Sequence, residues 1–447
     1  MKKEIVIVGA GLVGSLLSIY LAKRGYKVRI FERRADMRKE SMAAGRSINL
    51  ALSDRGIKAL EQVGIMTAIR SIAIPMHGRL IHGMEGKTNF QPYGKEGQFI
   101  NSVSRGELNK KLMDLAEEQG VELFFQEKCE KIDWEKNRVS FSNPDNVDLR
   151  EEGFELLFGA DGAYSAARLQ HQLQHDRFQY EQYYIDFGYK ELTIPPGKGG
   201  VFQMEKNALH IWPRGNYMLI ALPNTDASFT CTLFFPFEGD PSFASLDSRE
   251  KVMAFFERTF TDVLTLMPNL GDEFFTNPVS SLVTVKCYPW IRGEKFALIG
   301  DAAHAIVPFF GQGMNCGFED CSVLNGLLDK YHDQWEPVLQ EYQHLRKPDG
   351  DAIAELALNN FIEMRDKVAD PVFLLQKKIE ARLHEKFPDQ WIPAYSQVTF
   401  SPHIRYSEAL KRGRQQETIM QAVMRRPDVK DKWDTESFLQ SIIGQIY

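Results

Sequence analysis

Two glycine-rich stretches contain the residues of this chain whose types and spacing are best suited to binding a flat, charged ligand. The first begins with the apolar run Ile5–Val8, which leads directly into the sequence GAGLVG and a helical stretch. In such a unit the first glycine allows a tight turn, the second lets backbone approach a pyrophosphate, and the third lets helix and strand pack closely. A second apolar run, Val28–Phe31, ends in Glu32, which could accept from ribose hydroxyls, so the unit predicts a dinucleotide site. The glycines of the motif are Gly9, Gly11 and Gly14.

The second stretch is FALIGDAAHAIVPFFGQGMNCGFEDC, which runs from Phe296 to Cys321. Its apolar start ends at Gly300 and Asp301, so the acid lies at the carboxyl end of a strand, where open α/β sheets hold ligands. The glycines that follow Pro308 let backbone approach a flat ligand, and amides at a helix start favour partial negative charge, as at the N1–C2 edge of a reduced flavin. Taken alone, the stretch is equally consistent with a glycine-rich loop that closes an ordinary βα unit.

Other elements must position these two stretches. Apolar runs at 122–125 and 138–141 read as strands, and a run at 154–158 leads into Asp161 and Gly162, a second acid at a strand end. Residues 185–290 alternate apolar and polar, which predicts an antiparallel sheet, with a helix near 249–260, that forms one wall of a substrate chamber. After Cys321 the pattern is helical, with breaks expected at Pro348 and Pro371.

Composition narrows the class of protein. The 447 residues are 43% hydrophobic and carry a net charge of -6 without a basic run, so a folded protein with a small-molecule partner and no nucleic acid is expected. The five cysteines form no CxxC pair, which fits a reducing, cytoplasmic location and argues against a metal site. Lys2 and Lys3 before an apolar run could suggest a signal peptide, but the strand, helix, strand and acid favour the dinucleotide unit. No stretch offers the about 20 apolar residues of a membrane anchor.

Three motifs in this order, GAGLVG, Asp161-Gly162 and Gly300-Asp301, resemble those of the flavoprotein aromatic hydroxylases, which use one bound FAD and a transient NAD(P)H. Glu32 suits FAD or NAD better than NADP, and the lack of a second GxGxxG in the sequence agrees with transient binding of the nicotinamide. Longer stretches, from residue 4 to about 405, resemble the kynurenine 3-monooxygenase family, in its bacterial type without a hydrophobic anchor. They are GRSINLALSDRG at Gly45, HIWPRGNYMLIALPN at His210, IVPFFGQGMNCGFEDC at Ile306, NFIEMR at Asn360 and WIPAYSQVTF at Trp391.

The resemblance implies an α/β fold like that of para-hydroxybenzoate hydroxylase. A Rossmann-type FAD-binding domain is expected from residues 1–180 and 285–330, an antiparallel-sheet substrate domain from 181–284, and a C-terminal helical region from 331–447. The implied reaction converts L-kynurenine, NADPH and O2 to 3-hydroxykynurenine through a flavin C4a-hydroperoxide, in tryptophan degradation and the quinolinate route to NAD. No side chain is expected to act as a catalytic acid or base, and the protein is expected to be a monomer or a homodimer.

The resemblance also assigns site residues. The substrate's carboxylate is expected to bind Arg79 and Tyr93, with Asn360 and Tyr395 reaching its amino-acid end. Arg46 and Arg105 are candidates for flavin phosphate or ring contacts, although each could equally be a solvated helix cap. The full set expected to bind FAD comprises Gly9, Gly11, Val13, Gly14, Phe31, Glu32, Arg33, Arg34, Ala51, Arg105, Asp161, Asp301, Met314 and Asn315. Phe309, Phe310 and Met314 fit an apolar pocket floor as well as they fit a plain core.

Two other functions remain open from the sequence. A flavin hydroxylase for another anionic aromatic, such as a hydroxybenzoate, would need a base that deprotonates a phenol. A flavin-binding module whose redox state controls a partner would bind FAD and form no aromatic product. Measuring NADPH consumption with each aromatic and identifying the product separates the three hypotheses.

Overall fold

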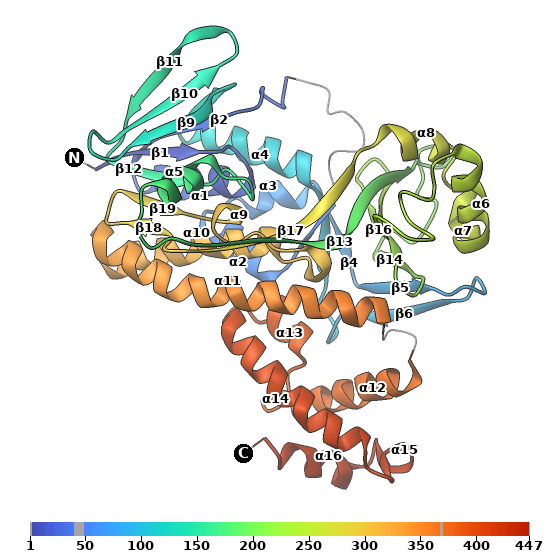
Figure 1. Cartoon of the computed structure of the whole chain (residues 1–447). Coiled ribbons are helices and arrows are strands. Elements are labelled where there is room, and N and C mark those ends of the chain that lie inside the picture. The colour runs from blue at the N-terminus through green and yellow to red at the C-terminus, as the bar shows by residue number, and fades with distance from the viewer. Residues whose placement is uncertain (1, 40–48, 367–369, 447) are drawn as a thin grey trace.

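A six-stranded sheet forms the first half of the molecule, at the left of Figure 1, in a computed structural model that describes residues 2–39, 49–366 and 370–446. Its strands are parallel except for the β18–β19 pair. The residues Ile5–Ile7 of the central strand β1 have no exposed surface, because the strand is covered on both faces, and this explains its uninterrupted apolar sequence. In order across the sheet the strands are β18 (Ile291–Arg292), β19 (Phe296–Leu298), β12 (Leu156–Gly159), β1 (Glu4–Val8), β2 (Lys27–Glu32) and β8 (Glu122–Phe125).

Helices and two small sheets surround this sheet. Helix α1 follows the GAGLVG turn and packs against both α4 and α10. The helices here are α1 (Leu12–Lys23), α2 (Asp54–Gln62), α3 (Met66–Arg70), α4 (Arg105–Glu118), α5 (Ala166–Leu173), α9 (Asp301–His304) and α10 (Gly313–Lys330), with the 3-10 turn η1 (Pro308–Phe310). The small sheets are β3 (Asn49–Leu52), β7 (Ile100–Ser104) and β4 (Ala73–Met76), and β11 (Asn146–Gly153), β10 (Arg138–Asn143) and β9 (Lys128–Asp133).

A seven-stranded sheet forms the second half, at the right of Figure 1. Its order is β17 (Val279–Tyr288), β13 (Gln179–Ile194), β16 (Phe229–Pro236), β15 (Met218–Pro223), β14 (Ala208–Pro213), β5 (Gly78–His82) and β6 (Thr88–Pro92). Helices α6 (Arg249–Thr259), α7 (Thr261–Leu264) and α8 (Leu270–Thr276) cover its outer end. A hairpin turn at Arg214–Asn216 joins β14 to β15, and in it the N–H of Arg214 bonds to the carbonyl of Tyr217.

The sheet differs from the sequence prediction in one respect. Strands β5 and β6 join it from before residue 181, and β5 pairs with β14 in parallel, so the sheet is mixed rather than purely antiparallel. The alternation in 185–290 could not reveal this, because pairing partners that are distant in the chain leave no local pattern. The domain boundaries given above stay a prediction.

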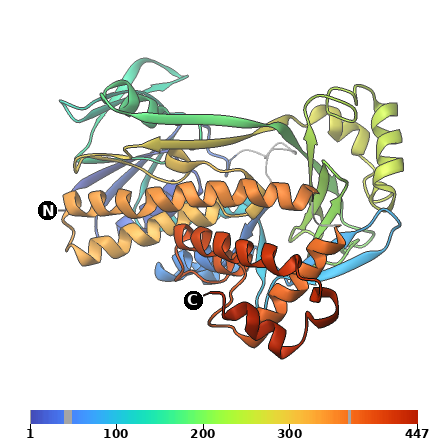
Figure 2. The ribbon, with the colours of Figure 1, turned by 60° about the horizontal axis from the view of Figure 1, so that its bottom comes forward.

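The C-terminal region is helical, as expected, and consists of α11 (Trp335–Asp366), α12 (Pro371–Lys386), α13 (Ala394–Thr399), α14 (Tyr406–Met424), α15 (Val429–Lys432) and α16 (Glu436–Ile443). Figure 2 shows α11 lying beside α10 and running from the first half of the molecule to the second. The break expected at Pro348 was wrong, because Pro348 lies inside α11. The flanking residues Arg346 and Asp349 are held in buried ion pairs, which offset the lost backbone hydrogen bond. Pro371 does start a new helix, capped by Asp370.

Candidate functional site

A cavity of about 440 Å³ lies where the two large sheets meet. One end is formed by the GAGLVG loop and the ends of β2 and β12, and the other by strands of the seven-stranded sheet and by Tyr395 of α13. Its size falls in the usual range for small-molecule sites. Of the residues predicted from the sequence, those that line it are Gly9, Gly11, Val13, Phe31, Glu32, Arg33, Arg34, Ala51, Arg79, Tyr93, Arg105, Asp161, Asp301, Met314 and Tyr395. Arg46 lies outside the described residues.

The three motif glycines have different environments. A Cβ at Gly14 would lie 2.1 Å from the carbonyl oxygen of Gly9, so Gly14 serves the packing of α1 on the turn and does not line the cavity. Gly9 has a φ of +104° and lies against Ala160 of the next strand's loop. A Cβ at Gly11 would meet no atom within 4 Å, so this glycine faces open space in the cavity. Backbone at Gly11 is therefore free to be approached by a ligand.

Two strands lead to acidic residues beside the GAGLVG loop, Glu32 at the end of β2 and Asp161 just after β12. The Glu32 carboxylate accepts from the N–H of Ala10 at 2.9 Å and of Arg34 at 3.1 Å, which ties the end of β2 to the glycine turn. Asp161, in contrast, accepts from the N–H groups of Ala166 at 2.7 Å and Ala167 at 3.1 Å, and so caps helix α5. Glu32 thus stands beside the turn where a dinucleotide would lie, while the carboxylate of Asp161 is already engaged.

The far end of the cavity combines one cation with aromatic and aliphatic walls. The guanidinium of Arg79, on β5, lies 5.4 Å from the ring centroid of Tyr93 and 4.7 Å from that of Tyr395. The two tyrosine rings stack at 5.7 Å, and the Tyr93 hydroxyl is buried without a hydrogen-bond partner among the described residues. The walls are Leu209, Met218, Ile220, Leu222, Thr232, Phe234, Phe309 and Phe310. An anionic group is what such a chamber can bind, because its cation is surrounded by apolar surface.

Two predicted contact residues support the lining from behind. Asn360 of α11 donates from Nδ2 to the carbonyl of Phe309 at 2.6 Å. Asn315 of α10 donates to the carbonyls of Ala51 and Gly311, both at 2.8 Å. Neither asparagine lines the cavity, so the structure gives them the task of fixing the loop at Pro308–Gly313. Phe31, in contrast, does line the cavity, and its fully buried ring stacks on that of Phe141 with 4.2 Å between the centroids.

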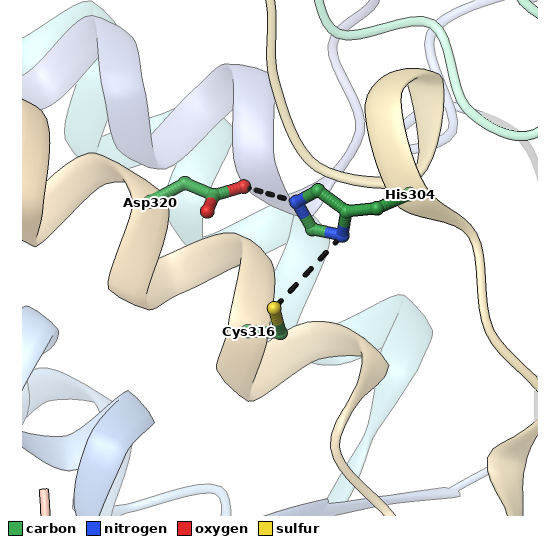
Figure 3. A group of neighbouring side chains, drawn as sticks. All are labelled: His304, Cys316 and Asp320. Atoms are coloured by element: carbon green, nitrogen blue, oxygen red, sulfur yellow. Dashed lines mark hydrogen bonds and ion pairs between the residues drawn. The ribbon is translucent and has the colours of Figure 1, made fainter. Parts of the chain in front are cut away.

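The second glycine-rich stretch itself contains a buried cluster of His304, Cys316 and Asp320 (Figure 3). His304 Nε2 lies 2.6 Å from the Asp320 carboxylate, and its Nδ1 lies 3.9 Å from the Cys316 sulfur, on the opposite edge of the ring. One metal ion cannot be reached by both edges of an imidazole, and Arg346, 2.7 Å from Asp320 and 3.3 Å from the sulfur, already supplies a cation. The cluster is an ion-pair network rather than a metal site.

Asp320 fixes the turn that presents Asp301 to the cavity. Besides His304 and Arg346, the carboxylate accepts from the N–H of Gly300 at 3.0 Å, and Gly300 has a φ of +62° that favours glycine. Burial opposes both charges of the pair, yet the pKa of His304 is raised by Asp320 and the pKa of Asp320 is lowered by His304 and Arg346. The Asp320 carboxylate thus holds both Gly300, which precedes Asp301, and His304, which follows it at the end of α9.

The sequence did not single out every lining residue. Glu127, Lys128 and Cys129 border the cavity beside Glu32, because β9 follows directly on the strand next to β2. The apolar walls on β14 to β16 lay within the predicted sheet, but alternation alone does not tell which face meets a cavity and which meets a core.

Comparison with known proteins adds a second line of evidence. The profile of the FAD binding domain family matches residues 2–357. A kynurenine 3-monooxygenase of Christiangramia forsetii is 50% identical over 446 residues, covering 100% of this chain and 99% of that relative. The chain belongs to the kynurenine 3-monooxygenase family. A family member from Sus scrofa is 44% identical over 426 residues, covering 95% of this chain and 89% of its own. The resemblance inferred from the motifs is confirmed.

Solved structures confirm the fold class. The tetrameric form of 2-methyl-3-hydroxypyridine-5-carboxylic acid oxygenase aligns with a TM-score of 0.67 at 20% identity, covering 85% of this chain and 96% of that one. PqsL of P. aeruginosa, solved in complex with 2-aminobenzoylacetate, aligns with a TM-score of 0.65 at 19% identity, covering 82% and 97%. At this identity the likeness concerns the fold alone. Within the parts of the chain that are described, no helix has both the length and the apolar character needed to cross a membrane.

Proposed function

We propose that this chain hydroxylates L-kynurenine to 3-hydroxykynurenine with bound FAD, NADPH and O2, as the family's name describes for its relatives. The observation that carries the proposal is the position of Arg79, a cation beside two stacked tyrosine rings in an apolar chamber that is continuous with the GAGLVG loop. L-kynurenine offers an α-carboxylate for that cation and an aromatic ring for the apolar walls. The cavity therefore suits both ends of this substrate.

The residues at the glycine loop fit FAD. The open space at Gly11 leaves room for a pyrophosphate against backbone, and Glu32 stands at the end of β2 where a ribose would be bound. Arg105 and Asp301 line the same part of the cavity, from the start of α4 and of α9. When bound, FAD takes electrons from NADPH and activates O2 for transfer of one oxygen atom to the ring.

The chain's own contribution to the reaction is binding, orientation and exclusion of water. The guanidinium of Arg79 can form two charge-assisted bonds to the carboxylate, and the unpartnered hydroxyl of Tyr93 can donate a third. With that end fixed, the aniline ring lies among the side chains of β14 to β16 and the Pro308–Phe310 turn, where water is displaced. The amino group already activates the ring at the carbon beside it, so no side-chain base is required.

The alternative substrate is a hydroxybenzoate. Its phenol would need a base for activation, which the lining residues Tyr93, Tyr189 and Tyr395 could supply, so an assay has to separate the two substrates. The test compares NADPH consumption with L-kynurenine and with para-hydroxybenzoate and identifies the product by mass spectrometry. Acceleration by kynurenine with formation of 3-hydroxykynurenine supports the proposal. Acceleration by the hydroxybenzoate instead, or bound flavin without aromatic product, refutes it.

The proposal includes a cytoplasmic location and a monomeric or homodimeric state. A site enclosed by residues of one chain, from β5, α13 and the GAGLVG loop, can work without a partner subunit. Light scattering after gel filtration would measure the mass, and a larger assembly would refute this part alone.

A further inference from the structure

Arg55, on helix α2, is bound to a part of the chain that is very distant in sequence. Its side chain is fully buried, and its guanidinium donates to the Glu319 carboxylate and to main-chain carbonyls of the segment 397–404, which follows Tyr395. The acceptors are the carbonyl oxygens of Val398 at 2.6 Å, Ile404 at 2.5 Å, Gln397 at 3.2 Å and Ser401 at 3.4 Å. We call residues 397–404 the latch segment.

Charge and packing keep this guanidinium in place. It forms an ion pair of 2.5 Å with Glu319 of α10, which is itself paired with Arg346 of α11 at 2.7 Å. The ring of Tyr406 lies 4.0 Å from the guanidinium carbon. A buried cation is tolerated only when its donors are satisfied, so this set of partners fixes one geometry.

The latch segment includes the last three of the six residues of helix α13, whose second residue is Tyr395. The Tyr395 ring packs on both walls of the chamber, 4.7 Å from the Arg79 guanidinium and 5.4 Å from the Phe310 ring. Arg55 itself is not among the residues that line the cavity. Whatever holds the latch segment therefore also holds Tyr395 against Arg79.

We propose that Arg55 is a positioning residue for the substrate site, which acts by holding the latch segment and thereby Tyr395. The inference rests on the function proposed above for its kinetic readout. Lysine cannot replace Arg55 in this role, because a single ammonium has three donors and no planar fork with which to reach carbonyls on opposite sides. The effect should be on binding of substrate rather than on binding of FAD, since the main-chain acceptors of Arg55 all lie in the latch segment and its side-chain acceptor, Glu319, does not line the cavity.

The test compares Arg55→Lys with the control Arg24→Lys in the flavin-loaded enzyme. Arg24 also bonds a side chain and a main-chain carbonyl, both of Asn325, but has no contact with the latch segment. Hydrogen exchange of the amides in 397–404 is measured without substrate. KM and kcat for L-kynurenine are measured for each arginine variant twice, once with Tyr395 intact and once combined with Tyr395→Ala. Glu319→Gln, which removes the anion that orients Arg55, serves as a milder second variant if Arg55→Lys yields no folded protein.

The expected result is faster exchange of the latch segment in Arg55→Lys but not in Arg24→Lys. A KM raised about tenfold or more is expected with flavin content unchanged, because displacement of a positioning group by about 1 Å can cost up to about a hundredfold. That penalty should shrink in the Tyr395→Ala background. The inference would be overturned if exchange of the latch segment in Arg55→Lys were unchanged. It would also be overturned if the KM penalty were equal with Tyr395 and with Tyr395→Ala, or if the rise in KM were accompanied by loss of flavin. If the unaltered protein does not turn over kynurenine, the proposed function fails, and the exchange result alone decides the role of Arg55.

Discussion

The substitution Arg79→Met tests the assignment of the substrate's carboxylate to this cation. Methionine keeps an unbranched side chain beside the rings of Tyr93 and Tyr395, whose centroids lie 5.4 and 4.7 Å from the guanidinium carbon of Arg79, so the aromatic walls retain a neighbour. What is lost is the charge and its donors. The fold and the glycine loop should be unaffected, because Arg79 lies at the opposite end of the cavity from Gly11.

The magnitude follows from the donors that a carboxylate would lose. A hydrogen bond to a charged group contributes about 1.5–3 kcal/mol, and two from one guanidinium are not fully additive, so a loss of about 3 kcal/mol is expected. This corresponds to an increase in Kd of about 150-fold. The Tyr93 hydroxyl remains as a single donor and sets the residual affinity.

The assay is titration of the flavin's visible spectrum with L-kynurenine, paired with a 2-aminophenyl ketone that lacks the amino-acid end. The substitution should weaken binding of kynurenine and leave binding of the ketone nearly unchanged, while the flavin content of both proteins stays equal. Equal losses for the two ligands would mean that Arg79 supports the pocket's shape instead of binding the carboxylate. No loss for either would remove Arg79 from the site.

Three further predictions concern the cofactor end and the buried charges. Gly11→Ala should fold normally, since its Cβ meets no atom within 4 Å, but should purify with little or no flavin. The control Gly326→Ala, at an equally open position, should keep its flavin. Full flavin absorbance in both variants would refute the pyrophosphate position. Glu32→Ala removes an acceptor from two loop amides and from the expected ribose, so FAD affinity measured by fluorescence should fall about tenfold or more, and retained flavin after gel filtration would contradict it. Asp320→Asn breaks a buried pair and should lower the free energy of unfolding in urea by about 3–5 kcal/mol at neutral pH. Because the folded-state pKa of Asp320 is lowered, its stabilisation is present above the unfolded pKa of about 3.9 and disappears as the pH falls through the lowered value. The pKa of His304 is raised, so its contribution to stability is complete below about pH 6.5 and disappears as the pH rises through the raised value. A difference in unfolding free energy between variant and parent that does not change with pH would contradict the pairing.

The cofactor end of the site was predictable from local sequence. A glycine pattern between two apolar runs specifies a turn whose backbone geometry only glycine accommodates, as Gly9 and Gly14 show, and the acid that ends the second run is placed by the strand itself. These features depend on residues within about thirty positions of one another, so the local sequence is enough to predict them. The same logic identified Asp301 at the end of β19.

The substrate end was reached from the sequence only through resemblance to a family. Arg79 is one arginine among many until β5 pairs with β14 and helix α13 brings Tyr395 beside it, and these contacts join segments hundreds of residues apart. The supporting roles of Asn315, Asn360 and Asp320 were equally hidden, because a side chain that bonds a distant loop looks the same in sequence as one that meets a ligand. The chain's local pattern thus determined where a dinucleotide unit begins and which turn it uses. Tertiary structure alone decided which cation faces the chamber, since burial and pairing of a charge depend on everything that folds around it.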